Sequence, residues 1–197
     1  MKNLFLFLIV LFISACSTLP VLPPVDDVDA VWQQHHQQLS KLGSWKMTGR
    51  IAVSNETDSW HATLQWIEQP DQYMINIIAP MGQGGAQIQG DSHHVILRSD
   101  EGKTFQASTA EELLARHTGW RVPLEGMRFW ARGLPKPDGT NIQKLNASGQ
   151  LAELTQSGWL IKFKRYQRVN NLALPGKVFM DSGELKVKIV IDSWEIN

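Results

Sequence analysis

The strongest constraint on the fold of this chain is an alternation of apolar and polar residues with a period of two, which starts at Trp45. In WKMTGRIAVS, residues 45–54, the large apolar side chains stand at odd positions and the charged ones at even positions. Successive side chains of a β-strand point to opposite faces of a sheet, so this alternation predicts a strand with one buried face. Similar stretches between turn residues predict further strands at residues 60–67, 73–79, 86–90, 94–99, 103–107, 149–156, 158–167, 176–181 and 184–196.

Three other stretches have the spacing and end signals of helices, at residues 31–42, 109–119 and 123–134. Asp29 stands at a capping position before the first helix. Thr109 and Glu112 form a capping-box pattern at the second, which Gly119 ends. About ten strands would leave exposed edges in a flat sheet, and closure removes such edges. The sequence therefore predicts a mainly β (α+β) fold built on a closed or half-closed antiparallel barrel.

The N-terminus has the layout of a secretory signal. Lys2 precedes an unbroken apolar run at residues 4–13, and small residues then lead to Cys16, the single cysteine of the chain. The apolar run is too short to span a hydrocarbon core, which needs about 20 residues. We expect a signal peptide at 1–15, a lipidated Cys16 with a proline- and aspartate-rich tether at 16–29, and a single domain at 30–197.

Charge and motifs argue against nucleic-acid binding and catalysis. Removal of residues 1–15 takes away only Lys2, so acidic residues then exceed basic ones by one, which leaves no surplus to neutralise phosphates. EGKT at 101–104 ends like a phosphate-binding loop, but Leu97 stands where that loop needs its first glycine. The paired histidines are sequence neighbours, and neighbours on a strand face opposite ways. We expect no enzyme activity, no metal and no cofactor other than the covalent lipid on Cys16.

Several of these segments resemble those of known families. ISAC at 13–16 resembles the lipobox of bacterial lipoproteins, and Ser17 after the cysteine is similar to the residue of outer-membrane rather than inner-membrane members. WKMTGRIAV from Trp45, APMG at 79–82, the block at 110–135 ending VPLEGMRFWARGLP, LPGKVFM and IVIDSW resemble the LolB family of lipoprotein receptors. The resemblance implies a half-open antiparallel barrel of about eleven strands, with helices covering an apolar cavity.

The resemblance also implies a function and two sites. A LolB-like protein would accept lipoproteins from the carrier LolA, hold their acyl chains and insert them into the outer membrane without nucleotide hydrolysis. The loop at Pro80, Met81 and Gly82 would enter the membrane, with Met81 where the family is expected to have leucine. Candidates for the cavity lining are the inward-facing large side chains Trp45, Ile51, Trp60, Leu64, Trp66, Ile75, Ile77, Ile88, Leu97, Phe105, Met127, Trp130 and Trp159, with Leu113 and Leu114 as weaker candidates.

Two alternatives stay open at this point: a lipoprotein that binds another lipid or hydrophobic ligand, and a scaffold lipoprotein whose barrel is packed solid. We expect a monomer on the periplasmic side of the outer membrane of a Gram-negative bacterium, with a LolA-type carrier and lipoprotein acyl chains as partners. A basic stretch could meet an acidic carrier or simply form a solvated strand face; it comprises Lys162, Lys164, Arg165 and Arg168.

Overall fold

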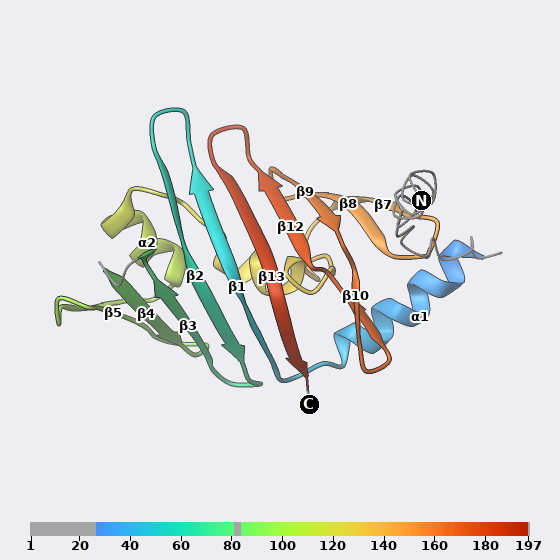
Figure 1. The fold of residues 1–197 in the computed structure, drawn as a ribbon, viewed down its shortest axis with the longest axis horizontal. Coiled ribbons are helices and arrows are strands. Elements are labelled where there is room, and N and C mark those ends of the chain that lie inside the picture. Colours follow the sequence, from blue (N-terminus) through green and yellow to red (C-terminus); the bar gives the residue numbers. More distant parts are fainter. Residues whose placement is uncertain (1–26, 81–83, 197) are drawn as a thin grey trace, which may run out of the picture.

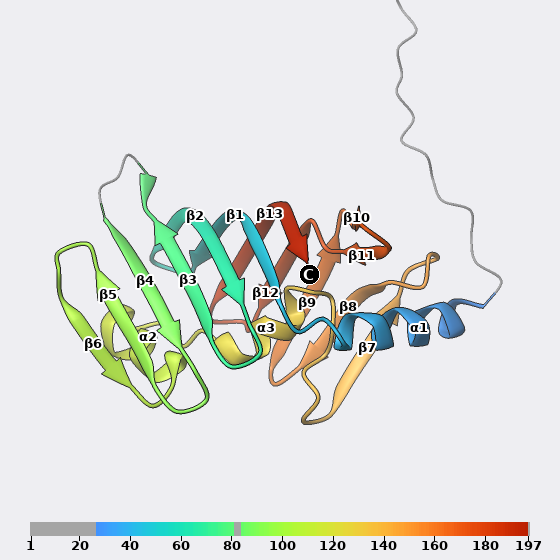
Figure 2. The ribbon, with the colours of Figure 1, turned by 90° about the horizontal axis from the view of Figure 1, so that it is seen from below.

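A computed structural model describes residues 27–80 and 84–196, and its main feature is one curved antiparallel sheet of eleven strands with helices on the concave side (Figures 1 and 2). The strand order is β6-β5-β4-β3-β2-β1-β13-β12-β9-β8-β7, so the sheet is not closed and β6 and β7 form its edges. The predicted half-open barrel is therefore confirmed. The strands of this sheet are β1 (Trp45–Ser54), β2 (Ser59–Glu68), β3 (Tyr73–Ile78), β4 (Gly85–Gly90), β5 (Val95–Ser99), β6 (Thr104–Ala107), β7 (Asn141–Leu145), β8 (Leu151–Gln156), β9 (Trp159–Lys164), β12 (Lys177–Asp181) and β13 (Lys186–Ile196).

The centre of the sheet follows the alternation in the sequence. Along β1 every odd position from Trp45 to Val53 is buried, and the even positions are at least partly exposed. β1 pairs over its whole length with β2 and with β13. Its register with β13 shifts between Thr48 and Gly49. A side chain at Gly49 would overlap the backbone carbonyl of Val190, so glycine is required where the two strands approach.

All three predicted helices are present, and α2 matches its predicted bounds most closely. α2 (Ala110–Thr118) begins after Thr109, whose hydroxyl accepts a hydrogen bond from the Glu112 amide at 3.2 Å, and it ends at Gly119 in the left-handed conformation. α1 (Val28–Ser40) starts earlier than predicted, because Asp27 rather than Asp29 caps it by accepting from the Ala30 amide. α3 (Leu124–Trp130) is shorter than the predicted helix at 123–134.

Four strands differ from the sequence-based expectation: β7, β9 and the two short strands that follow β9. The predicted strand at 158–167 ends at Lys164, because Arg165 adopts φ +57° and turns the chain out of the ladder. Beyond it β10 (Gln167–Val169) and β11 (Leu172–Leu174) form a separate two-stranded ribbon. The alternation does not predict β7, because its middle three residues are all exposed, the apolar Ile142 included.

The concave side is divided between a packed half and a hollow half. Under β8, β9, β12 and β13 the buried side chains of these strands fill the space with the indole of Trp130. Under β1 to β5 a cavity is left open. No helix in the described part of the chain is long and apolar enough to cross a bilayer. The predicted signal peptide, Cys16 and most of the tether, together with Met81 and Gly82 of the predicted membrane loop, lie outside the described residues.

Candidate functional site

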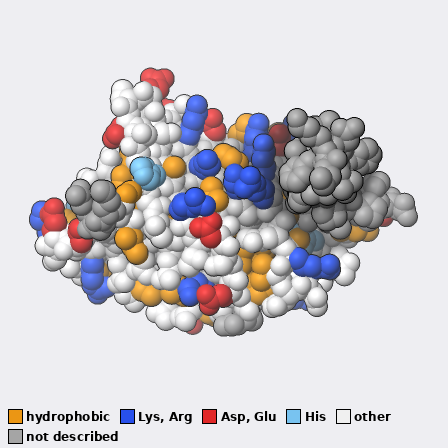
Figure 3. Space-filling model, in the orientation of Figure 1, with side chains coloured by type: hydrophobic (Ala, Val, Ile, Leu, Met, Phe, Trp, Pro, Cys, Tyr) orange, Lys and Arg blue, Asp and Glu red, His pale blue; other side chains and the backbone are white. Residues whose placement is uncertain are grey.

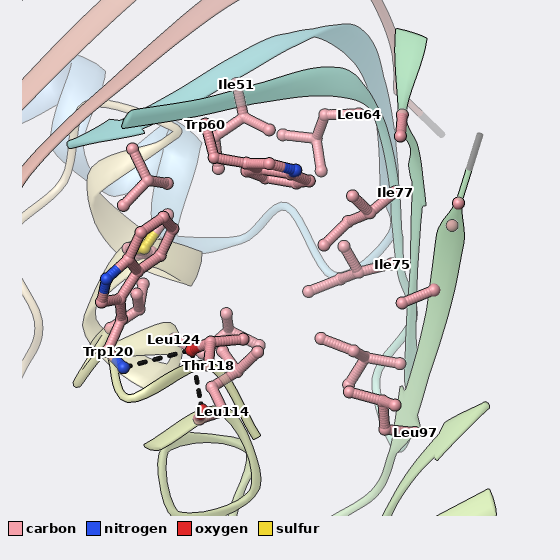
Figure 4. Close-up of a pocket in the computed structure, with 18 of the residues that line it drawn as sticks. Ile51, Trp60, Leu64, Ile75, Ile77, Leu97, Leu114, Thr118, Trp120 and Leu124 are labelled. Carbon is pink, nitrogen blue, oxygen red and sulfur yellow. Dashed lines mark hydrogen bonds between the residues drawn. The ribbon is translucent and has the colours of Figure 1, made fainter. Parts of the chain in front are cut away.

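The hollow half of the sheet encloses a cavity of about 480 Å³ between the strands and the helical side. Strands β1 to β5 supply one wall, and α2, the connection after it and α3 supply the other (Figure 4). In the close-up Trp60 projects into the cavity from β2 and Trp120 from the helical side. Ile75 and Ile77 of β3 and Leu97 of β5 line the strand wall beyond Trp60. The volume is within the range of small-molecule pockets, roughly 300–1,000 Å³. A barrel packed solid, one of the two alternatives, is excluded for this half.

Nine of the thirteen candidate side chains lie in this cavity wall, and Leu114 joins them. All except Met127, which belongs to α3, lie on the inward-facing side of β1 to β5, at positions where alternation predicts them. The depth of the cavity is apolar and buried, with exposed fractions of 2% or less at Ile75 and Ile88. The nine are Ile51, Trp60, Leu64, Trp66, Ile75, Ile77, Ile88, Leu97 and Met127.

Four candidates lie elsewhere, and Leu113 is buried in the core. Trp45 packs between Trp66 and Trp194, with ring centroids 5.5 Å from each and the rings tilted rather than parallel. Trp130 faces the packed half, where its indole donates to Gln156 at 3.0 Å, and Trp159 lies beside it at 6.3 Å. Phe105 on β6 packs against the His117 ring of α2 at 3.8 Å. Trp130 and Trp159 therefore belong to the packed half, the His117 ring of α2 covers Phe105, and Trp45 lies behind the wall residue Trp66.

Sequence reasoning missed the part of the wall formed by the connection between α2 and α3. Trp120 and Val122 of this connection line the cavity, although their segment has no helical or strand period, and Leu124 at the start of α3 lies next to them in the wall. Thr118 also faces the cavity, yet its hydroxyl donates to the Leu114 carbonyl at 2.8 Å and accepts from the Trp120 amide at 3.1 Å. The local backbone therefore satisfies this hydroxyl, and an apolar group that enters the cavity would not leave it without a hydrogen-bond partner.

The cavity opens toward the turn between β1 and β2. Asp58 and Ser59 are exposed there, while Trp60 and Trp120 are partly buried just inside. Ala79 and Gly84, at the base of the β3–β4 connection, also contribute to the rim. Polarity therefore falls from the mouth to the floor, the gradient suited to an amphiphile with its apolar end inside.

A buried polar network holds the inner wall in place. Glu68, which ends β2, is 5% exposed and accepts from the Trp66 indole at 3.1 Å. Its other carboxylate oxygen pairs with Arg128 of α3, whose guanidinium lies 5.7 Å from the Tyr73 ring. Desolvation raises the pKa of Glu68, and the attraction of Arg128 only partly offsets this. The ion pair thus ties a wall tryptophan of the sheet to the helix opposite.

A second buried arginine joins α3 to the end of α1. Arg132 donates to the backbone carbonyls of Arg128 at 3.1 Å, Leu39 at 3.3 Å and Leu42 at 3.1 Å. Its guanidinium also lies 5.9 Å from the ring of Trp45. Burial lowers the pKa of Arg132 to about 10, so it remains charged at neutral pH. These bonds fix α3 as a rigid floor of the cavity.

Among residues 27–80 and 84–196 no group of three or more histidine, cysteine or acidic side chains is placed to hold a metal. The cavity wall contains one titratable side chain, Asp58, and it stands at the exposed mouth. The arrangement therefore supplies a binding surface rather than a pair of groups for acid–base chemistry.

Comparison with known proteins gives a consistent result. A family model described as "Outer membrane lipoprotein LolB" matches residues 43–194. An outer-membrane lipoprotein LolB of Nitrosococcus oceani is 34% identical, covering 94% of this chain and 93% of the relative. One from Pseudomonas savastanoi is 31% identical, covering 99% and 96%. A solved LolA superfamily protein of Nitrosomonas europaea shares the fold, with a TM-score of 0.55 at 7% identity over 88% of this chain and 94% of its own.

Proposed function

This chain belongs to the LolB family of outer membrane lipoproteins, and on that premise we propose that it accepts lipoproteins from a LolA-type carrier and passes them to the outer membrane. Their acyl chains would occupy the cavity under β1 to β5. No nucleotide hydrolysis is needed if each transfer runs downhill in free energy. The expectation of a monomer, and of a chain that carries no catalytic site, stays a prediction.

The cavity is the observation that carries this proposal. Its inner wall consists of aliphatic and aromatic side chains, the Thr118 hydroxyl is satisfied by the backbone, and its mouth at Asp58 and Ser59 is polar. Such a surface rewards the burial of methylene groups and offers nothing specific to a charged or hydrogen-bonding ligand. Acyl chains are therefore the ligand class that suits it.

The size of the cavity also suits a temporary holder. Burial of about ten methylenes would contribute about 8 kcal/mol, equivalent to a dissociation constant of roughly 1 μM. A bilayer buries every chain of a lipid anchor in full, so it would hold the same cargo more strongly. A site of intermediate affinity can take cargo from a weaker carrier and lose it to the membrane.

The regions outside the described residues complete the proposal. Lipidation of Cys16 would anchor the protein, and the tether between Cys16 and the start of α1 at Val28 extends at most about 3.5 Å per residue. The domain could therefore stand off the membrane while Met81 still reaches it. Pro80, which precedes Met81, lies on the outer surface of the sheet beside His61 and Thr63.

Transfer from a loaded carrier tests the proposal when one variant fills the cavity. Ala86 of β4 lines the cavity, so Ala86→Trp would occupy space that cargo needs. We predict that it lowers acceptance of radiolabelled lipoprotein by about tenfold or more, since losing the burial of about two methylenes suffices for that. Gln89→Trp is the matched control, because Gln89 is exposed on the opposite face of the same strand.

The outcome distinguishes cargo held in the cavity from cargo held elsewhere on the protein. Wild type and Gln89→Trp should accept cargo equally, and all three proteins should keep the same far-ultraviolet circular dichroism. Equal acceptance by a folded Ala86→Trp would show that the cavity is not the holding site. If free fluorescent fatty acid binds but lipoprotein stays on the carrier, the protein is a lipid binder without the hand-over role.

A further inference from the structure

Positive charge gathers on the convex face of the sheet, opposite the cavity (Figure 3). One row of register-paired residues across β1, β13, β12 and β9 reads Arg50, Val190, Lys177 and Lys164. The next row brings Lys188 of β13 beside Phe179 of β12. We call the following five residues the basic cluster: Arg50, Lys164, Arg165, Lys177 and Lys188.

Few carboxylates balance this cluster. Arg50 pairs with Asp192 at 3.0 Å, and both side chains of that pair are more than half exposed. Within the described ranges the other four members form no ion pair closer than 4.0 Å. Partial desolvation, followed by repulsion from the four other cluster members, lowers the pKa of Lys177. Like charges crowded in this way are relieved by an anionic partner.

Apolar side chains lie among these charges. The ammonium groups of Lys164 and Lys188 are 5.9 and 5.7 Å from the ring centroid of Phe179, which is itself partly exposed. Leu160 of β9 is 37% exposed, and it lines a shallow groove on this face together with Phe179 and Lys188. Phosphates and upper acyl carbons lie close together at the interface of a bilayer, so cations around a partly exposed aromatic ring can contact both at once.

The basic cluster is continuous with the base of the β3–β4 connection. A second shallow groove on the convex face, separate from the one at Phe179, joins Arg50 and Lys188 to Pro80. The residue before it, Ala79, belongs to the rim of the cavity. One backbone step therefore links the convex groove to the cavity, so a membrane on the cluster would also lie near the cavity rim.

We propose that the basic cluster and the partly exposed ring of Phe179 form a docking surface for the anionic phosphate headgroups of a lipid bilayer. The inference relies on the membrane attachment in the proposed function but not on cargo transfer. An acidic protein fits less well, because the convex face is opposite the lining of the cavity, where a carrier has to deliver acyl chains.

Lysine footprinting on full-length lipidated protein tests the surface without carrier or cargo. The protein is placed in vesicles of phosphatidylcholine, whose headgroup has no amine to acetylate, with or without phosphatidylglycerol, and treated with a membrane-impermeant acetylating reagent. We expect acetylation of Lys164, Lys177 and Lys188, relative to exposed Lys103, to fall about fivefold on the anionic vesicles. Salt at about 1 M, which shortens the screening length to about 3 Å, should abolish the protection.

A charge-reversed variant shows whether the cluster itself causes docking. Lys164→Glu/Lys188→Glu should remove the protection of the remaining Lys177. As the control, Lys41→Glu/Lys103→Glu changes the net charge by the same amount at exposed sites outside the cluster and should leave the protection of Lys177 intact. Because this variant lacks Lys103, acetylation is then normalised to exposed Lys144. Equal folding of both variants is checked by circular dichroism.

Three results would overturn the proposal. One is cluster lysines that react equally on neutral and anionic vesicles. Another is protection that survives the double reversal in the cluster. The third is protection of Lys177 by soluble carrier in detergent but by no vesicle, which would assign the surface to the carrier. A failure of cargo transfer leaves the vesicle result unaffected, so the two proposals fail separately.

Discussion

Glu68 is the residue on which the shape of the inner cavity wall most depends. It holds the indole of Trp66, a wall residue, and receives the guanidinium of Arg128 from α3. Removing one partner of a buried ion pair is costly because it leaves a charge without its counterion. Substitution of Arg128 by an apolar residue should therefore disturb the cavity more than substitution of an exposed arginine.

Glu68 also predicts a pH dependence. Burial raises its folded-state pKa above the ordinary 4.5, so the folded chain holds this proton more tightly than the unfolded chain. The stability contributed by the proton is present below pH 4.5 and is lost as pH rises through the folded-state pKa. Glu68→Gln keeps an acceptor for Trp66 but cannot titrate, so its stability should lack this decline. Urea unfolding at several pH values between about 4 and 8 measures the free energy of unfolding of both proteins. If that free energy changes with pH in the same way in wild type and Glu68→Gln, Glu68 is not the source of the decline.

Met81 gives a prediction that depends on sequence and family alone. We expect Met81→Glu to accept cargo normally but to deliver it poorly into vesicles, because a carboxylate is unfavourable in hydrocarbon. Met81→Leu should deliver normally, since it keeps an apolar side chain of similar size. Release of radiolabelled lipoprotein from preloaded protein measures the step. Normal delivery by Met81→Glu would mean that this side chain has no part in insertion.

Individual site residues could be predicted where strand alternation alone decided which face of the sheet their side chains occupy. Ile75 and Leu97 lie on regular strands, so alternation alone places them inside the sheet. The same rule turns Trp159 inward, but which half of the concave side stays hollow depends on how α3 crosses it. Trp120 lies in an irregular connection, so no period could identify it as a wall residue.

At the scale of elements, β1 depends on a close approach to β13. Gly49→Ala would force a methyl group against the Val190 carbonyl at the register shift. Overpacking of this kind costs about 1–3 kcal/mol, so the free energy of unfolding should fall by about that amount. Gly43→Ala is the control, because an added methyl there would meet only Pro70, at 3.9 Å. Equal unfolding midpoints in urea would show that the strands can move apart.

Elements were predictable where local signals agreed with their surroundings. Thr109 and Gly119 bound α2 because capping is a property of the segment itself. Three aspartates lie close to the start of the first helix, and the sequence does not distinguish which of them caps it. β7 is an edge strand whose middle residues are all exposed, the apolar Ile142 included, and its pairing with β8 supplies the order that its own sequence does not encode.

For the whole molecule, the division of the sheet into two halves explains how a small domain can be both stable and hollow. The packed half and the network around Arg132 supply a rigid frame. The other half leaves about 480 Å³ unfilled without loss of the fold. Closed barrels have no free edges; here the open edges β6 and β7 leave the concave side accessible.

The claim that acyl chains enter this cavity is tested most directly by photocrosslinking. A lipoprotein with diazirine groups in its acyl chains would be loaded on a carrier, presented to the full-length protein and irradiated, and the adducts located by mass spectrometry. The account predicts adducts on peptides that contain Ile75, Leu97 and Trp120, with few on the convex strand face around Phe179. Accepted cargo whose adducts fall on the convex face, or evenly over the surface, would contradict it.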